Sequence, residues 1–147
     1  MRNPRADSEA FNGGFWKSGD IGSIDAEGYV RIADRKKDMI NRGGYKVYPA
    51  EVENVLCEHG QVVEAAVVGR QDEILGERVV AFVNCKEPLA EDAIREFCAS
   101  RLAHYEIPDH IVAAVDPPLP RNANGKIQKN ELRERAAQLP RIHRTTK

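Results

Sequence analysis

Several features that define whole classes of protein are scarce in this sequence of 147 residues. It contains only three cysteines, which lie far apart without a C-x-x-C pair, so it has neither the spacing of a zinc site nor that of a disulfide framework. The four histidines also stand singly, and we therefore predict no metal site. The formal net charge is −1, whereas a protein dedicated to nucleic-acid binding usually carries a strong basic excess.

Long apolar runs are missing as well. No run approaches the roughly 18 residues that a membrane-spanning helix needs, so the sequence predicts no integral membrane segment. The N-terminal residues lack the apolar stretch of a signal peptide, and we expect a cytoplasmic protein.

What is present is typical of a globular domain, with 41% hydrophobic and 31% charged residues. A chain of this length can bury a core without help from a disulfide or a metal. Cys98 lies among Ile94, Phe97 and Leu102, and Cys57 ends an apolar row of a predicted helix. We therefore expect both thiols to be buried among apolar side chains.

The chain divides at a charged stretch. Residues 1–33 contain two short extended runs around a turn that ends at Gly28, which predicts a β-hairpin. Residues 34–38 read Asp-Arg-Lys-Lys-Asp and have no apolar periodicity, so we predict that they connect the hairpin to the next domain. That domain comprises residues 39–140, and residues 141–147 are expected to be a frayed, solvated tail.

The pattern of residues 39–140 mixes strands with helices. Extended runs occur at 39–40, 62–68, 77–85 and 110–115, and helical apolar spacing occurs at 49–60, 90–105 and 129–138. We therefore predict a small mixed α+β domain of about three core strands and three helices, preceded by the β-hairpin and a hinge.

Three loops hold glycine beside charged residues without contributing to a core. They are Ser-Gly-Asp at 18–20, the stretch 34–45 with its glycine pair, and Asn-Ala-Asn-Gly-Lys at 122–126. A carboxylate can accept hydrogen bonds from sugar hydroxyls, consecutive glycines let the backbone approach a ligand closely, and a lysine can bring a movable charge to a phosphate. Taken singly, each loop is better explained as a solvated turn.

Taken together, in this order and at these separations, the loops resemble the C-terminal part of the adenylate-forming superfamily. That superfamily includes acyl- and aryl-CoA ligases, firefly-type luciferases and the adenylation domains of peptide synthetases. The resemblance runs through Phe-Trp-Lys-Ser-Gly-Asp at 15–20, Asp-Arg-Lys-Lys-Asp-Met-Ile-Asn-Arg-Gly-Gly-Tyr-Lys-Val-Tyr-Pro-Ala-Glu-Val-Glu at 34–53 and Leu-Pro-Arg-Asn-Ala-Asn-Gly-Lys-Ile at 119–127. It covers nearly the whole chain.

The resemblance implies a reaction in two steps. A carboxylate attacks the α-phosphate of ATP·Mg, which gives an acyl-adenylate and pyrophosphate, and the thiol of CoA then displaces AMP. The resemblance makes Lys126 the catalytic lysine of the first step, where a cation meets the charge that develops on the α-phosphate.

It also implies roles for the other loops. Asp20 and Arg35 would bind the ribose, and Lys37 would be the hinge of a mobile lid formed by residues 39–140. The backbone of Gly43 and Gly44 would line the channel for the pantetheine arm of CoA. Rotation at the hinge would withdraw the catalytic lysine and present the glycine face instead.

Three positions depart from the family pattern. Ser18 stands where relatives usually carry threonine, and a hydroxyl is kept. Asn41 stands where luciferases carry a lysine, which points away from luciferase. Pro108 has the neighbours Ile107 and Asp109, whereas relatives that bind CoA often have basic residues there, so contacts to the CoA nucleotide phosphates would have to come from elsewhere.

The resemblance further implies a partner. A large N-terminal domain would supply the phosphate loop, the walls around the carboxylic acid and, together with ATP, the site of Mg²⁺. Residues 1–33 resemble the end of that domain, so we expect a fragment of an AMP-forming acyl-CoA ligase that is inactive alone. Two alternatives stay open: the lid of an adenylation enzyme that loads a carrier protein, and a stand-alone binding or regulatory module.

Overall fold

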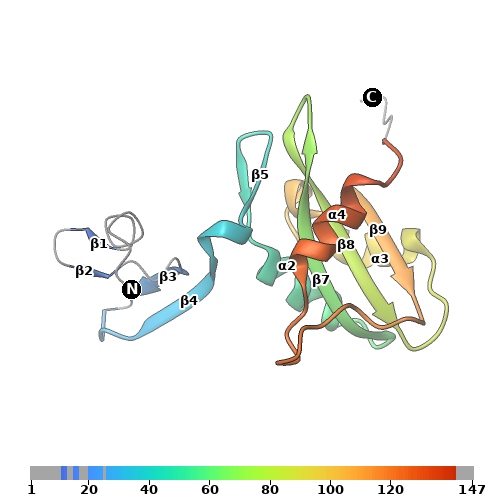
Figure 1. The fold of residues 1–147 in the computed structure, drawn as a ribbon, viewed down its shortest axis with the longest axis horizontal. Coiled ribbons are helices and arrows are strands. Elements are labelled where there is room, and N and C mark those ends of the chain that lie inside the picture. The colour runs from blue at the N-terminus through green and yellow to red at the C-terminus, as the bar shows by residue number, and fades with distance from the viewer. Residues whose placement is uncertain (1–10, 13–14, 17–19, 25, 142–147) are drawn as a thin grey trace. The chain divides into compact units, whose positions relative to one another are not determined.

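The computed structural model describes residues 11–12, 15–16, 20–24 and 26–141. The chain forms two compact units, residues 1–37 and residues 38–147, and each is described by itself. Figure 1 shows the smaller unit in blue and the larger one in cyan to red. Within the described residues, no helix has both the length and the apolar composition needed to cross a membrane.

The first unit consists of two antiparallel hairpins. Strand β1 (Phe11–Asn12) pairs with β2 (Phe15–Trp16), and β3 (Asp20–Ile24) pairs with β4 (Val30–Arg35). The turn between β3 and β4 contains Gly28, whose φ is +85°. The hairpin predicted around this glycine is confirmed.

The second unit contains a mixed sheet of five strands. They are β5 (Ile40–Arg42), β6 (Tyr45–Val47), β7 (Val62–Asp72), β8 (Gly76–Cys85) and β9 (His110–Ala114). The order is β6-β5-β8-β7, and β9 also pairs with β8. The β8–β9 pair is parallel and the other pairs are antiparallel. The long β7–β8 ladder is the frame of the unit.

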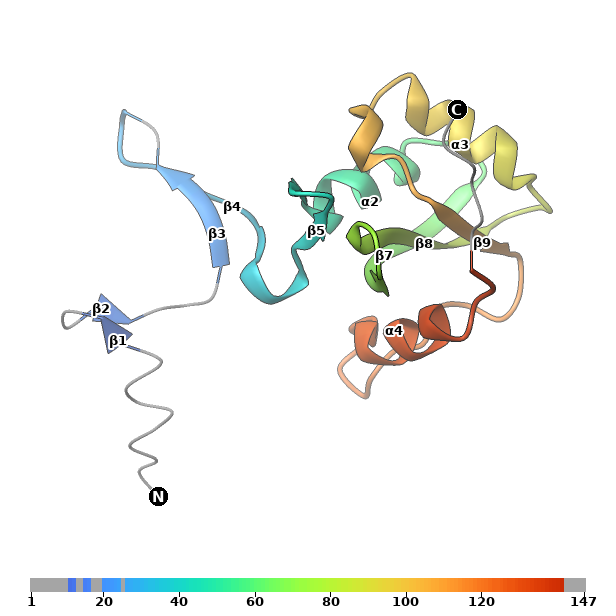
Figure 2. The same ribbon diagram turned by 90° about the horizontal axis from the view of Figure 1, so that it is seen from above.

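Helices cover both faces of this sheet. The α-helices are α2 (Pro49–Cys57), α3 (Glu91–Ala99) and α4 (Lys129–Ala137), and the 3₁₀ helices are η1 (Lys36–Asp38) and η2 (His104–Glu106). Figure 2 shows α2 and α3 on one side of β7, β8 and β9 and α4 on the other. The predicted α+β class is confirmed, with three α-helices on a five-stranded sheet among the residues that the structure describes.

The longest predicted helix is shorter than expected. Helix α3 ends at Ala99 instead of continuing to Tyr105. The Ser100 hydroxyl donates a hydrogen bond to the Phe97 carbonyl over 2.8 Å, which competes with helical bonding. The chain then turns into η2, and Tyr105 stacks on Tyr45 of β6 with ring centroids 4.5 Å apart.

Runs of consecutive apolar residues in β7 and β8 build one core on each face of the sheet, because successive side chains of a strand point to opposite faces. Val79, Ala81 and Val83 belong to the core under α2 and α3, whereas Val80 and Phe82 belong to the core under α4. Each strand is therefore apolar on both faces, as expected for the centre of three layers.

The two cysteines with predicted positions behave differently. Cys98 is fully buried in the core under α3, as predicted, and burial raises its pKa to about 11. Cys57 is exposed, so the prediction for it was wrong. It is the last residue of α2 and extends beyond Val52 and Leu56, which carry the buried face of that helix.

Candidate functional site

The loop before α4 is held by hydrogen bonds along its own backbone. The Asn122 amide donates to the Lys126 carbonyl over 2.9 Å, and the Gly125 amide donates to the Asn122 carbonyl over 3.0 Å. The Asn122 side-chain oxygen accepts the amides of Asn124 and Lys126, each over 3.0 Å. Gly125 has a φ of +79°, a conformation that glycine adopts without strain.

The side chain of Lys126 takes no part in these hydrogen bonds. The residue is exposed, and its amine has no hydrogen bond or ion pair among the side chains that the structure describes. Both backbone polar groups of Lys126, in contrast, are bonded to Asn122. The loop therefore combines a fixed backbone with a cation that can reach outward.

An ion pair connects the loop to strand β7. Glu64 accepts the Leu119 amide over 2.9 Å and pairs with the guanidinium of Arg121. The same guanidinium donates to the Gly125 carbonyl over 2.7 Å. The residue directly before Lys126 is thus tied to the sheet through a carboxylate and a guanidinium.

The glycine pair turns the chain between β5 and β6. Gly43 and Gly44 have φ values of +59° and +89°, and the Gly43 amide donates to the Leu75 carbonyl over 2.7 Å. That hydrogen bond brings the backbones of two hairpins together, and a Cβ atom on Gly43 would lie only 3.2 Å from a methyl group of the Leu75 side chain. Between the hairpins lies a recess of about 520 Å³ that both glycines line with Ile74 and Glu77.

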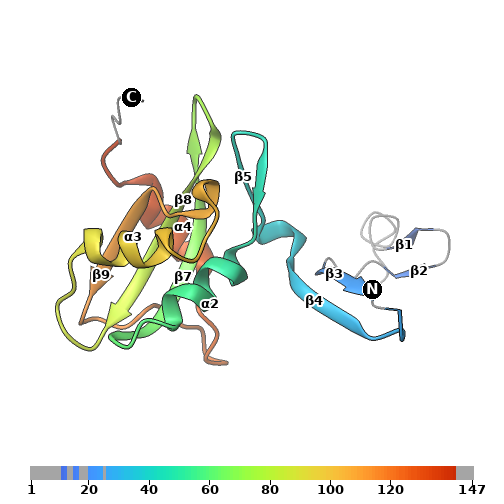
Figure 3. The same ribbon diagram turned by 180° about the vertical axis from the view of Figure 1, so that it is seen from behind.

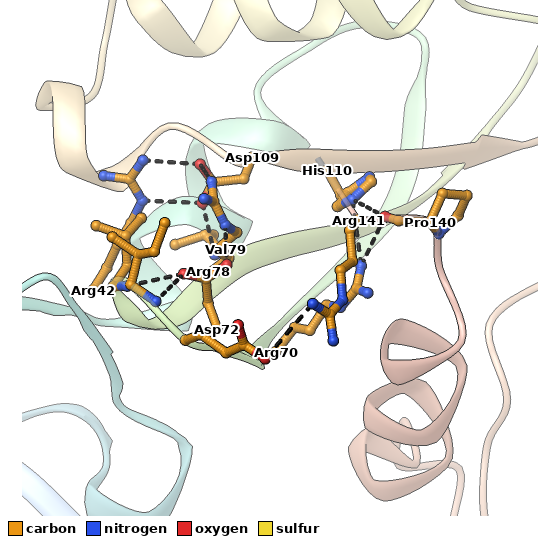
Figure 4. A network of polar contacts seen from close by, with 12 residues as sticks. Arg42, Arg70, Asp72, Arg78, Val79, Asp109, His110, Pro140 and Arg141 are labelled. Carbon is orange, nitrogen blue, oxygen red and sulfur yellow. Dashed lines mark hydrogen bonds and ion pairs between the residues drawn. The ribbon is translucent and has the colours of Figure 1, made fainter. Parts of the chain in front are cut away.

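A buried carboxylate anchors this hairpin. Asp109 is 5% exposed and takes the Arg42 guanidinium in a two-pronged pair, with nitrogen–oxygen distances of 3.0 and 2.8 Å. It also accepts the Val79 amide over 3.0 Å. Figure 4 shows these contacts together with Arg78, which bridges Asp109 and Asp72.

The pKa values follow from these pairs. The hydrogen bond to Asp109 raises the pKa of Arg42 above its ordinary value, against the opposing effect of burial. The hydrogen bond from Arg78, joined by the Leu75 amide, lowers the pKa of Asp72 to about 2. Both shifts favour the charged forms, the guanidinium of Arg42 and the carboxylate of Asp72.

The two loops lie at opposite ends of the β7–β8 ladder. Glu64, which holds the loop before α4, pairs with Asn84 near one end of the ladder, and Arg42 pairs with Gly76 at the other. The eight residue steps of β7 from Glu64 to Asp72 correspond to about 26 Å. Figures 1 and 3 show the β5–β6 hairpin at the top and the orange-red loop before α4 at the bottom.

The remaining predicted site residues, Asp20, Arg35 and Lys37, belong to the smaller unit. Asp20 opens β3 and Arg35 closes β4, and their Cα atoms are partners in the antiparallel register, so the fold brings these two positions together. Lys37 is exposed. Asp38, the next residue, pairs with Arg133 of α4 over 2.6 Å and belongs to the larger unit. Ser18 lies outside the described residues.

Sequence reasoning missed the side chains that hold both loops. Glu64 had one usable signal, because it is a lone charge inside an otherwise apolar run. Asp109 carries no such signal in the sequence, and its partner Arg42 lies 67 residues away. Among the described residues no group of three or more potential metal-ligating side chains is present.

The fold and the three loops together define a class, the C-terminal domains of adenylate-forming enzymes. The family model described as the AMP-binding enzyme C-terminal domain matches residues 51–126, which is more than half of the chain. The chain belongs to this family, and the resemblance inferred from its motifs is confirmed.

Two relatives are CoA ligases. A long-chain fatty acid–CoA ligase of Mycobacterium tuberculosis is 45% identical over 140 residues, which are 94% of this chain and 27% of that protein. A 2-succinylbenzoate–CoA ligase of Listeria monocytogenes is 40% identical over 135 residues, or 92% of this chain and 28% of the relative. The chain thus spans just over a quarter of the length of these relatives, and their names favour the CoA-ligase interpretation over the two alternatives.

A solved structure has the same fold. The o-succinylbenzoate CoA synthetase of Bacillus subtilis, in complex with its acyl-adenylate intermediate, matches with a TM-score of 0.78 and 38% identity. The match covers 85% of this chain and 25% of the synthetase.

Proposed function

We propose that this chain is the mobile C-terminal lid of an AMP-forming acyl-CoA ligase. The enzyme would join a carboxylic acid to the α-phosphate of ATP with release of pyrophosphate, and would then transfer the acyl group to the thiol of CoA with release of AMP. The lid would present one loop to the active site in the first step and the other in the second.

The observation that carries this proposal is the exposed amine of Lys126 on a loop with a fixed backbone. The first step joins two anions and builds charge on the α-phosphate. A cation positioned against that charge stabilises the transition state more than the ground state. Lys126 would supply this cation when the lid closes.

Rotation at Lys37 would exchange the two faces. The ion pair between Asp38 and Arg133 holds the residue after Lys37 on the larger unit, which supports a hinge that ends at Lys37. The hairpin of Gly43 and Gly44 would then line the channel for the pantetheine arm, where an added side chain would obstruct the passage.

The groups that bind the ribose, the triphosphate and the carboxylic acid would lie outside the lid. We infer that Asp20 and Arg35 bind the ribose hydroxyls, since their positions are partners across β3 and β4. A large N-terminal domain would hold the triphosphate, with its Mg²⁺, and the carboxylic acid. We also infer that the enzyme works in the cytoplasm and that the isolated chain is inactive.

The decisive experiment is a Lys126→Ala substitution in the full-length enzyme. Adenylate formation, measured as pyrophosphate release, should fall about 10²–10³-fold, because one preorganised contact to developing charge is lost. Thioester formation from supplied acyl-adenylate should change far less, since the lysine is withdrawn in that step.

The control is Lys86→Ala, which removes an exposed lysine after β8 and should leave both half-reactions unchanged. Equal losses in the two half-reactions of Lys126→Ala would contradict the proposed role. Pyrophosphate release by the isolated 147-residue chain would contradict the need for the N-terminal domain.

A further inference from the structure

We propose that Glu64 and Arg121 are positioning residues for Lys126, an inference that rests on the proposed function. Glu64 lies on β7 and never needs to approach the substrate. It acts through Arg121, whose guanidinium reaches both the Glu64 carboxylate and the carbonyl of Gly125. The pair thus holds the backbone at Gly125, directly before the residue whose amine would reach the substrate.

An irregularity in β7 aims Glu64 at this loop. The register of β7 against β8 shifts between Val62 and Glu64. Because of this shift, Val62 and Ala65 both face the core under α2 and α3, whereas Ala66 faces α4. Glu64 alternates with Ala65 and therefore falls on the α4 side, where the loop lies. β-bulges commonly redirect side chains near functional sites.

The loop needs a polar anchor because residues 121–126 are all exposed. Apolar packing begins only at Leu119 and Ile127, which lie against the core under α4. Glu64 holds both ends of this exposed segment. Its carboxylate accepts the Leu119 amide directly, and it pairs with Arg121, which donates to the Gly125 carbonyl.

A second carboxylate fixes the chain after the loop. Glu53 of α2 pairs with Lys129 over 2.8 Å and also accepts the Val67 amide at the open edge of β7 over 2.9 Å. Lys126 thus lies between two attachments to the same strand. Breaking the Glu64 attachment should loosen the loop and leave α4 in place.

The test uses Glu64→Gln and Arg121→Ala. In the 147-residue chain, ¹⁵N relaxation should show the order parameters of residues 123–126 falling from about 0.85 to below 0.6, the range of flexible backbone. In the full-length enzyme, kcat for adenylate formation should fall roughly 10- to 100-fold, as expected when a reacting group is displaced by about 1 Å. Thioester formation from supplied adenylate should be unchanged.

Two further variants keep the test interpretable. Arg121→Lys keeps the charge but has a single amine in place of the two-nitrogen fork, so it should impair adenylate formation without unfolding the domain. The double variant of Glu64→Gln with Arg121→Ala should lose no more than the worse single variant, because the two residues act as one unit. The matched control is Arg135→Ala, which breaks the exposed pair with Glu131 on α4 and should change neither half-reaction.

Four results would overturn the proposal. Unchanged loop order in both single variants would show that the pair does not hold the loop. Equal losses in both half-reactions would show a general structural role. Normal adenylate formation in Glu64→Gln and Arg121→Ala, with Lys126→Ala strongly impaired, would reject positioning and leave the proposed function standing. If Lys126→Ala were itself without effect, the proposed function would fail, and the positioning role with it.

Discussion

The Gly43–Gly44 hairpin and the Asn122–Lys126 loop are attached to the same ladder by the same chemistry, a guanidinium on a carboxylate. They differ in what they offer to the outside. The hairpin presents bare backbone, and the loop presents a long charged side chain. The comparison teaches that a small domain can present two chemically unlike surfaces if each has its own ion-pair tether to the same β7–β8 ladder.

The tethers also differ in burial. The Arg42 and Asp109 side chains are 17% and 4% exposed, whereas those of Arg121 and Glu64 are 45% and 15% exposed. Breaking a buried pair leaves an uncompensated charge and is strongly destabilising, whereas an exposed pair contributes little to stability. The hairpin tether should therefore matter for folding, and the loop tether mainly for local order.

The largest expected effect is that of Asp109→Ala on stability. The substitution leaves the Arg42 guanidinium and the Val79 amide without their partner, and it should lower the free energy of unfolding by about 3–5 kcal/mol. Chemical denaturation of the chain measures this loss. Arg121→Ala, which breaks the more exposed tether of the loop before α4, should cost only about 1 kcal/mol or less. Similar costs for both variants would remove the distinction between the tethers.

A matched pair of glycine substitutions sharpens the functional comparison. Gly44 and Gly125 both have positive φ, and an added Cβ would meet nothing within 4 Å at either position. Alanine at each should therefore cost about 1–2 kcal/mol of backbone strain without a clash. In the full-length enzyme, Gly44→Ala should slow thioester formation, and Gly125→Ala should slow adenylate formation.

Gly60→Ala is the control for this pair. An added Cβ at Gly60 also meets nothing within 4 Å, but its φ is not positive, so stability and both half-reactions should be nearly unchanged. If Gly44→Ala and Gly125→Ala slowed the same half-reaction, the two loops could not serve different steps.

The smallest expected effect concerns pH. The pKa of Asp72 is lowered to about 2 in the folded chain from an unfolded value of 3.8, so its ion pair with Arg78 contributes fully above pH 4 and is lost as the pH falls toward 2. The contribution should be about 1 kcal/mol, because the Arg78 and Asp72 side chains are 15% and 19% exposed and water still screens part of their attraction.

Asp72→Asn isolates this charge, because an amide oxygen can still accept the amides of Ile74 and Leu75. Thermal unfolding between pH 5 and pH 2 should show a smaller loss of stability for the variant than for the parent chain. Asp92→Asn, at a carboxylate that is 91% exposed, is the control. An identical acid profile for Asp72→Asn and the parent would contradict the assignment.

Much of the architecture could be predicted because its signals are local. Continuous runs of β-branched and other apolar residues predict β7 and β8, and helical apolar spacing predicts α2 and α4. The same spacing extended α3 too far, since Leu102 and Tyr105 continue its apolar row but reach the core through a turn and a 3₁₀ helix. Cys57 occupies a position of the apolar row of α2, but it is exposed at the last turn of that helix.

The site was only half predictable for the same reason. Glycines beside charges identify the two loops, because that composition is local. The carboxylates that fix the loops are set by strand register: Glu64 is 57 residues from Arg121, and Asp109 is 67 residues from Arg42. No local pattern predicts such pairs, and the register shift in β7 that redirects Glu64 is equally invisible in the sequence.

These long separations have a consequence for synthesis of the chain on the ribosome. At about 5–20 residues per second, Asp109 is made several seconds after Arg42, and Arg121 follows Glu64 by a similar delay. Neither loop can acquire its tether until nearly the whole domain has been translated. In an incomplete nascent chain both loops would thus lack their tethers, and the two tethers would form at almost the same stage of synthesis.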